Sequence, residues 1–278
     1  MDKSEGGFSP KFTLALKPAE WFQPYVTYSE SLRSPSINET FMGGSHPGGA
    51  SATFQPNPFL EPEKQKGWEF GFNTRQHHAL VRNDSFFLKA DYFTMDVENY
   101  ITTMSTPAYN YFYNTPGTSK VQGVELQSMY DARVVFAGLS YTYTDADLPS
   151  QVSGFGSPTY VADHVVVANL GVRLFDEKLT LGGRVSYTGQ TFVGTPNVGS
   201  FYAYPYMPAY TLVDLYSSYE VYKGLDVGLN VDNLFDESYT PSQSTPQGFG
   251  PTCFGSNTPG CNTSGMGRTI YATVKAQF

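Results

Sequence analysis

The chain has 278 residues and a formal net charge of −8, and 16% of its residues are aromatic, with 21 Tyr and 21 Phe but only 2 Trp. No stretch approaches the roughly 18 consecutive apolar residues that a membrane helix requires, which excludes a helical membrane protein. The acidic balance and the lack of a basic patch argue against nucleic acid as a partner.

Apolar and polar residues alternate in eleven segments, which predicts β-strands rather than helices. The predicted strands cover residues 11–17, 22–32, 66–76, 85–104, 120–131, 133–144, 163–175, 178–189, 208–221, 224–235 and 267–278. In the last of them Ile270, Ala272, Val274, Ala276 and Phe278 alternate with polar or amphipathic residues. Because successive side chains of a strand point to opposite faces, such a segment can present one face to lipid and the other to water.

The connections between these strands alternate between tight links and long loops rich in Gly, Pro, Ser and Asn. Short turns at one end and long loops at the other are typical of outer-membrane barrels, so the predicted fold class is an all-β, antiparallel transmembrane β-barrel. A soluble β-sandwich also alternates, but its strands are usually shorter and its loops are not sorted in this way. Eleven strands cannot close an even-stranded barrel, and we therefore expect the C-terminal half of a larger barrel, with the preceding strands missing.

Two cysteines, Cys253 and Cys261, lie in one loop rich in Gly, Pro, Asn and Ser. In an oxidising compartment this pair predicts a small disulfide, and the alternative is two free thiols. A metal site is not expected, because it usually needs more soft ligands than two cysteines. The N-terminus has no basic region followed by an apolar core, so no secretory signal is recognised; for an outer-membrane protein, this indicates a truncated chain.

Three short segments carry a family resemblance. They are Gln-Gly-Val-Glu-Leu at 122–126, Val-Asp-Asn-Leu-Phe-Asp-Glu-Ser-Tyr at 231–239, and the final strand from Gly267 to Phe278. In this order they resemble the C-terminal part of the TonB-dependent outer-membrane receptors of Gram-negative bacteria. The resemblance implies that residues 1–278 form the C-terminal portion of a single barrel domain, about half of a 22-stranded receptor barrel. Neither a plug domain nor a TonB box is recognised, and coupling to the TonB-ExbB-ExbD complex would pass through that missing plug.

The loop at 33–63 resembles the haem and haemoprotein receptors of this family. In these receptors a Phe-Arg-Ala-Pro box and an Asn-Pro-Asn-Leu box flank a histidine that ligates haem iron. The corresponding segments here are Leu-Arg-Ser-Pro at 32–35 and Asn-Pro-Phe-Leu at 57–60, with His46 between them. The departures are Leu32 for Phe, Ser34 for Ala and Phe59 for Asn. The resemblance implies that haem is a transported ligand, and no tightly bound cofactor is expected.

The chemistry of the candidate ligand residues fits this interpretation. A neutral imidazole such as that of His46 is a good iron ligand, while its alternative is a solvated loop histidine. Arg33 is a candidate for pairing with a haem propionate, and its alternative is a structural ion pair with Glu39 or Glu63.

Three tyrosines of the next long loop, Tyr109, Tyr111 and Tyr113, are candidates for stacking on a porphyrin or an aromatic siderophore. Their alternative is packing within a loop or an aromatic girdle.

The sequence therefore predicts a receptor for an iron compound, with haem or haem from a haemoprotein as the first candidate. A ferric siderophore is the alternative cargo, and a passive porin-like channel is the alternative class. An enzyme is not expected, because no supported Ser/His/Asp constellation and no Gly-x-Ser-x-Gly elbow is present. The other expected partner is outer-membrane lipid.

Overall fold

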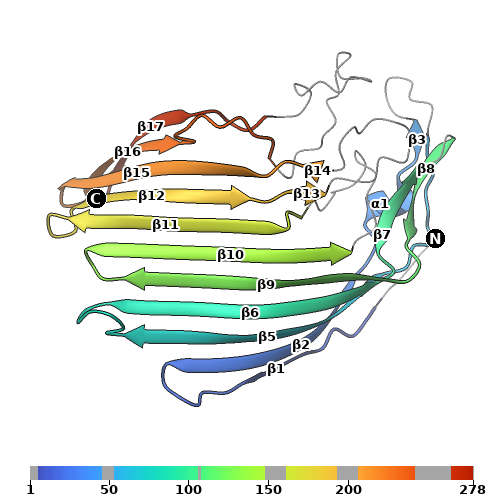
Figure 1. The fold of residues 1–278 in the computed structure, drawn as a ribbon. Helices are drawn as coiled ribbons and strands as arrows, with labels where there is room; N and C mark the ends of the chain where they lie inside the picture. Colours follow the sequence, from blue (N-terminus) through green and yellow to red (C-terminus); the bar gives the residue numbers. More distant parts are fainter. Residues whose placement is uncertain are drawn as a thin grey trace.

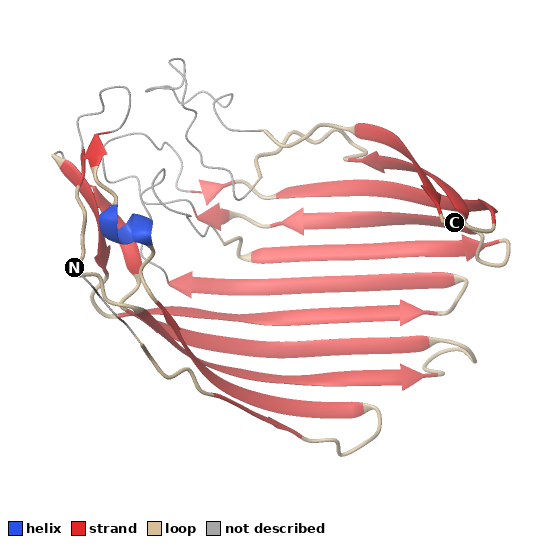
Figure 2. Ribbon diagram, turned by 180° about the vertical axis from the view of Figure 1, so that it is seen from behind, coloured by secondary structure: helices blue, strands red, loops and turns tan. Residues whose placement is uncertain are grey.

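The computed structural model describes residues 6–45, 53–105, 108–147, 161–192, 206–241 and 264–277. Its main feature is one antiparallel sheet of eleven strands that curves into an open wall (Figures 1 and 2). In spatial order these are β1 (Lys11–Ala15), β2 (Phe22–Arg33), β5 (Glu63–His77), β6 (Ser85–Glu98), β9 (Thr118–Asp131), β10 (Val135–Asp147), β11 (His164–Leu174), β12 (Leu179–Thr188), β15 (Tyr210–Tyr222), β16 (Leu225–Asp232) and β17 (Thr269–Ala276). Among the described residues, no helix combines the length and apolar character needed to cross a membrane.

The predicted fold class is confirmed, since each of the eleven predicted segments supplies one strand of this sheet. One boundary was wrong. The segment predicted as a single strand over 85–104 ends as β6 at Glu98, and β7 (Ile101–Ser105) belongs to a different sheet. Asn99 lies between them with φ of 57°, and this left-handed backbone, which Asn tolerates better than most residues, turns the chain out of the sheet.

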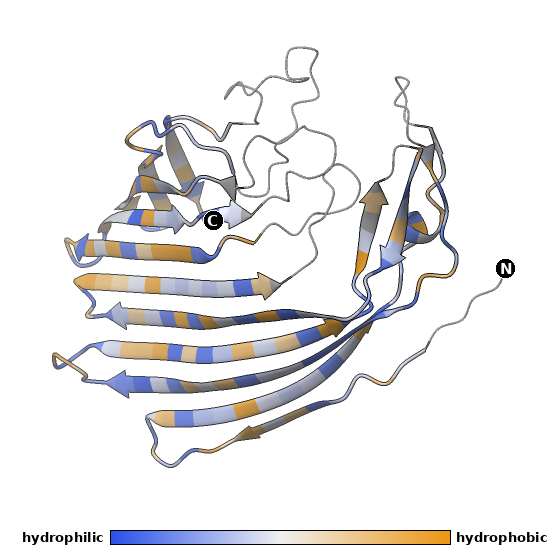
Figure 3. Ribbon diagram, turned by 45° about the vertical axis from the view of Figure 1, so that its right-hand side comes forward, coloured by the Kyte–Doolittle hydropathy of each residue, from blue (hydrophilic) through white to orange (hydrophobic). Residues whose placement is uncertain are grey.

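Hydrophilic and hydrophobic residues alternate along many of the strands (Figure 3). Because successive side chains point to opposite sides of a strand, this alternation gives the sheet two chemically distinct faces. Phe70, Tyr92 and Val124 are aligned across β5, β6 and β9, and they are 49%, 41% and 39% exposed. We call this apolar side the lipid face. On the opposite side the Tyr25 hydroxyl donates to Glu69 at 2.6 Å, as expected for the polar interior of a barrel.

The short turns gather at one end of the sheet, as predicted. In the turn between β5 and β6, the Asp84 carboxylate accepts the backbone N–H groups of Ala79, Leu80 and Val81 at 2.6, 2.8 and 2.9 Å. Although burial favours the neutral acid, these donors and the Tyr130 hydroxyl lower the pKa of Asp84 to about 2. A charged carboxylate thus replaces the strand ladder as the acceptor for the backbone of this turn.

The other end of the sheet carries additional structure that the sequence did not predict. A four-stranded sheet has the order β3 (Gly44–Ser45), β4 (Thr53–Phe54), β8 (Tyr109–Asn114) and β7, and the helix α1 (Ile37–Phe41) precedes it. We call this four-stranded unit the loop sheet. A further pair is formed by β13 (Thr191–Phe192) and β14 (Tyr206–Met207). The loop sheet has its own small core of Phe54, Leu60, Ile101 and Phe112, with Met42 packed against it.

Candidate ligand-binding site

The predicted site residues that the structure describes lie at the long-loop end of the sheet. Arg33 ends β2, and Tyr109, Tyr111 and Tyr113 lie on β8 of the loop sheet. His46, Cys253 and Cys261 fall outside the described residues, so the iron ligand and the disulfide stay predictions.

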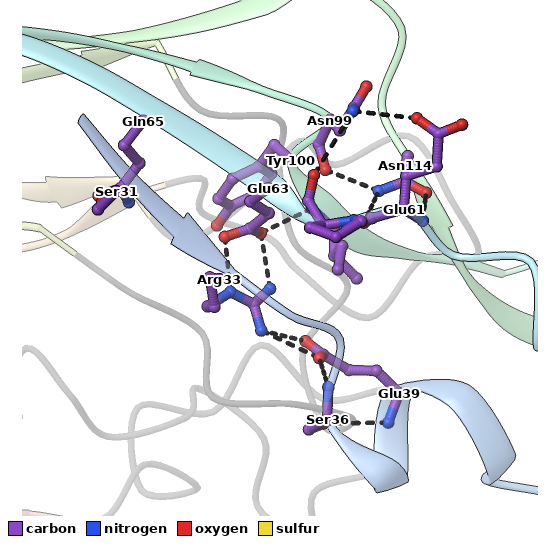
Figure 4. A network of polar contacts seen from close by, with 12 residues as sticks. Ser31, Arg33, Ser36, Glu39, Glu61, Glu63, Gln65, Asn99, Tyr100 and Asn114 are labelled. Carbon is purple, nitrogen blue, oxygen red and sulfur yellow. Dashed lines mark hydrogen bonds and ion pairs between the residues drawn. The ribbon is translucent and has the colours of Figure 1, made fainter. Parts of the chain in front are cut away.

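Arg33 is held by two glutamates (Figure 4). Its Nε and Nη2 donate to the two carboxylate oxygens of Glu63, each at 2.6 Å, and Nη1 donates to Glu39 at 3.0 and 3.1 Å. Glu63 is only 3% exposed, and it also accepts the backbone N–H of Ile101 at 2.8 Å. One buried carboxylate therefore joins the end of β2 to the start of β7. The structural alternative predicted for Arg33 is confirmed, with both glutamates as partners.

Glu39 connects the same cluster to α1. Its carboxylate accepts the Ser36 backbone N–H at 2.7 Å while the Ser36 hydroxyl accepts the Glu39 N–H at 3.2 Å, which is a capping box. Burial opposes the charge of Glu39, but the hydrogen bonds from Arg33 and Ser36 hold the pKa of its carboxyl below the ordinary value. The Leu-Arg-Ser-Pro segment at 32–35 is thus followed by α1, and Arg33 is bonded to this helix through Glu39.

The second box segment, at 57–60, docks onto the loop sheet. The Asn57 side-chain amide donates to the Phe112 carbonyl at 2.9 Å, and the Asn57 Oδ1 accepts the Phe59 N–H at 3.1 Å. Leu60 is 1% exposed and fills the small core between the strands. Both box segments consequently act as anchors on either side of the chain that carries His46.

Further polar contacts tie the loop sheet to the segment that leads into β5. Asn114 accepts the Glu61 N–H at 2.8 Å through Oδ1, and its Nδ2 donates to the Glu61 and Asn99 carbonyls at 2.9 and 2.8 Å (Figure 4). The Asn99 amide in turn donates to the Glu61 carboxylate at 3.1 Å. These asparagines and Glu63 were not expected from the sequence as site residues. A signal for them was the cluster of Asn and acidic residues at the ends of predicted strands.

The three predicted tyrosines form a row along one face of β8. The ring centroids of Tyr109 and Tyr111 are 5.8 Å apart and those of Tyr111 and Tyr113 are 6.0 Å apart. Burial, with a smaller contribution from Tyr111, raises the pKa of the Tyr113 phenol. The opposite face of the strand carries Phe112, which is buried in the small core. The row therefore lies on the side of β8 turned away from that core.

Strand pairing brings the stem of the His46 segment next to this row. Ser45 pairs with Thr53 in the β3–β4 hairpin, and β4 pairs in parallel with β8, so that Thr53 lies opposite Tyr109. His46 follows Ser45 directly in the sequence. Among the described residues, no group of three or more His, Cys, Asp or Glu side chains is arranged to hold a metal ion. The tyrosine row therefore forms an aromatic surface beside the β3–β4 hairpin, which is joined to β8 through β4.

The motif at 231–239 has a structural explanation in the turn after β16. Asn233 has φ of 51°, and its Nδ2 donates to the carbonyls of Glu237 and Met266 at 3.0 and 3.2 Å. Its backbone N–H donates to Asp214 at 2.9 Å, and Arg184 pairs with the same carboxylate at 2.7 Å. These contacts fix the motif, at the start of the long loop that follows β16, to β12 and β15.

Several known proteins with similar sequences are named for heme, hemin or ferrichrome. A heme/hemopexin utilization protein C of Haemophilus influenzae is 26% identical over 87% of this chain and 36% of its own length. The ferrichrome outer membrane transporter/phage receptor of Escherichia coli is 32% identical over 79% of this chain and 27% of its own length. The chain thus spans between about a quarter and little more than a third of the length of these relatives.

The fold has known counterparts as well. A solved double mutant of the Serratia marcescens hemophore receptor HasR, in complex with its hemophore HasA and heme, aligns with a TM-score of 0.73 and 29% identity over 97% of this chain and 39% of that chain. The family model of the TonB dependent receptor-like β-barrel matches residues 1–234. This chain therefore belongs to the TonB-dependent receptors, as part of their β-barrel, and is a protein of the Gram-negative outer membrane.

Proposed function

We propose that this chain is the C-terminal part of the barrel of a receptor that takes up an iron compound, and that the compound is haem. The observation that carries the proposal is the parallel pairing of β4 with β8. It brings the stem of the His46 hairpin, Ser45 and Thr53, alongside the tyrosine row that begins at Tyr109.

The chemistry of a porphyrin matches the two parts of this arrangement. A flat macrocycle stacks on aromatic rings, and Tyr109, Tyr111 and Tyr113 offer three rings at 5.8 and 6.0 Å intervals. The iron at its centre takes an axial ligand, for which the His46 imidazole is suited. In this proposal Arg33 anchors the loop, because most of its donors are already used by Glu39 and Glu63.

Import across the membrane would require segments beyond those of the sheet described here. We propose that a plug closes the barrel and that the TonB-ExbB-ExbD complex supplies the energy for transport. The similarity to the haem/hemopexin protein and to the hemophore receptor supports a haem cargo.

A ferric siderophore is the second candidate cargo. It is supported by the 32% identity with the ferrichrome transporter, and an aromatic siderophore would stack on the same tyrosine row. The two cargoes differ in what they require of His46, since only haem needs an imidazole as an axial ligand. A passive channel is a weaker alternative, because it needs no anchored ligand loop.

The test is a haemin titration of the complete receptor in detergent, followed by the Soret band. The expected result is a shifted band that His46→Ala abolishes or weakens. The matched control is His164→Ala, because this imidazole stacks on Tyr141 and lies beside Tyr143 on the lipid face of the eleven-stranded sheet, and is not part of the loop sheet. An unshifted wild-type band would reject haem and favour a siderophore, to be tested with ferrichrome. A band unchanged by His46→Ala would reject this histidine as the ligand.

A further inference from the structure

The face of the loop sheet that carries the tyrosine row also carries part of β7. Thr102 pairs with Tyr113 and Met104 pairs with Tyr111, and directly opposed residues of an antiparallel pair share one face. The Tyr111 hydroxyl donates to the Met104 sulfur at 3.2 Å. We call these four residues, together with Tyr109, the tyrosine face.

The tyrosine face is open at one end and covered at the other. Tyr109 and Met104 are 37% and 38% exposed, whereas Thr102, near the start of β7, is 4% exposed. A flat ligand that stacks on the open rings therefore lies next to a part of the same face that water does not reach.

Thr102 brings an unpaired polar group to this covered end. Its hydroxyl is buried and has no hydrogen-bond partner among the residues that the structure describes. A buried donor without a partner is costly, whereas valine has nearly the same shape and no such cost. A hydroxyl at this position is explained if a bound ligand supplies the acceptor.

We propose that the Thr102 hydroxyl donates a hydrogen bond to a propionate carboxylate of the haem. This inference deepens the proposed function and rests on it. The carboxylates of haem stand at one edge of the macrocycle on flexible arms, so one of them can reach the covered end while the ring stacks on Tyr109 and Tyr111. Hydrogen bonds to an ionised acceptor are roughly twice as strong as neutral ones, which suits a single hydroxyl donor.

The charged groups near this end leave the role to a neutral donor. Arg33, the other candidate for a propionate, already donates to Glu39 and Glu63. The Glu63 carboxylate accepts the N–H of Ile101, the residue before Thr102, but both of its oxygens are held by Arg33 at 2.6 Å. Its negative charge is therefore compensated next to the proposed carboxylate.

Tyr113 is the side chain placed to open the covered end. As the direct partner of Thr102, its Cβ lies about 5 Å from that of the threonine. The Tyr113 ring is only partly buried and turns about two side-chain bonds, so it can move aside while the backbone of β8 stays in place. The hydroxyl is thus closed to water in the free protein and becomes accessible to a ligand that displaces this ring.

The test titrates the complete receptor in detergent with haemin and with haemin dimethyl ester, whose propionates are neutral, and follows the Soret band. The wild type should bind haemin about 10- to 100-fold more tightly than the ester, as expected for one hydrogen bond to a charged group. Thr102→Val should weaken haemin binding by about 10-fold or more and ester binding by a few-fold at most. Thr102→Ser, which keeps the hydroxyl, should bind haemin as the wild type does.

The matched control is Thr94→Val, which removes a hydroxyl from the lipid face of β6, in register with Trp68 and Gln122. It should leave both titrations unchanged. Heat modifiability and circular dichroism check that each variant is folded.

The outcomes separate this inference from the proposed function. An unshifted wild-type band with haemin would reject haem as the cargo, and the role of Thr102 with it. If the band shifts, the haem proposal stands, and three results would still overturn the role of Thr102: equal affinities of the wild type for haemin and ester, wild-type haemin affinity in Thr102→Val, or an equal loss for both ligands in that variant.

Discussion

Replacing Arg33 tests whether the ion cluster holds the loop sheet onto the barrel wall. In Arg33→Ala the Glu63 carboxylate, which is 3% exposed, loses two charged hydrogen bonds of 2.6 Å and keeps the one from Ile101. Hydrogen bonds to charged groups contribute about 1.5–3 kcal/mol each. Since the Arg33 side chain is 44% exposed, solvent screens part of this energy, and we expect a local cost of about 2–4 kcal/mol.

The assay is hydrogen exchange at the Ile101 amide, which donates to the carboxylate in question. A cost of 2–4 kcal/mol corresponds to an increase of about 30- to 700-fold in the local opening constant. Arg33→Lys should fall between the wild type and alanine, because a lysine keeps the charge but cannot form the two-pronged contact.

The control for Arg33→Ala is Lys66→Ala, which removes one member of the exposed pair with Glu98. Exposed pairs contribute about 0–1 kcal/mol, so exchange at Ile101 should hardly change. The reasoning is refuted if Arg33→Ala accelerates that exchange no more than Lys66→Ala does.

Two further predictions concern the barrel wall. A Cβ on Gly182 would lie 2.3 Å from the Tyr216 ring, whereas on the adjacent Gly183 its nearest neighbour is a Leu215 methyl at 3.3 Å. Gly182→Ala should therefore cost about 1–3 kcal/mol in urea unfolding and Gly183→Ala under about 1 kcal/mol; equal costs would contradict this packing. Carboxyl NMR should give Asp84 a pKa near 2, below its ordinary value of 3.8. Because the folded-state pKa is depressed, its stabilising contribution is present above about pH 4 and is lost as the pH falls toward 2, and Asp84→Asn should abolish this dependence.

The eleven strands of the wall could be predicted because the pattern that defines each of them lies within the strand itself. In a membrane wall each residue faces lipid or the interior, so alternation along β12 or β17 records the fold directly. The failure at β6 has a local cause too. The composition of Ile-Thr-Thr-Met at 101–104 still fits a strand, and the chain leaves the sheet at the left-handed backbone of Asn99, which a pattern of hydropathy does not register.

The loop sheet could not be predicted in the same way. Its strands β3 and β4 are two residues long, too short for a periodic pattern, and they exist because Phe54 and Leu60 bury themselves against β7 and β8. The helix α1 did leave a signal, since Ser36 followed by Glu39 has the spacing of a capping box. The glutamate partners of Arg33 could be named in advance as an alternative, because Glu39 and Glu63 lie in the same predicted loop at 33–63.

Two of the three departures of the box segments from the haem-receptor pattern, Ser34 and Phe59, fall at positions that carry few of the anchoring contacts. Phe59 is 76% exposed and contributes its backbone N–H, which any residue other than proline supplies to Asn57. Ser34 is exposed as well, next to the arginine that makes the ion pairs. The positions that match the pattern make the anchoring contacts. Arg33 binds Glu63, the Asn57 amide donates to the Phe112 carbonyl, and Leu60 fills the small core. The boxes therefore match the haem-receptor pattern at the positions whose side chains anchor the loop, and under the proposed function the residues held between these anchors would select the cargo.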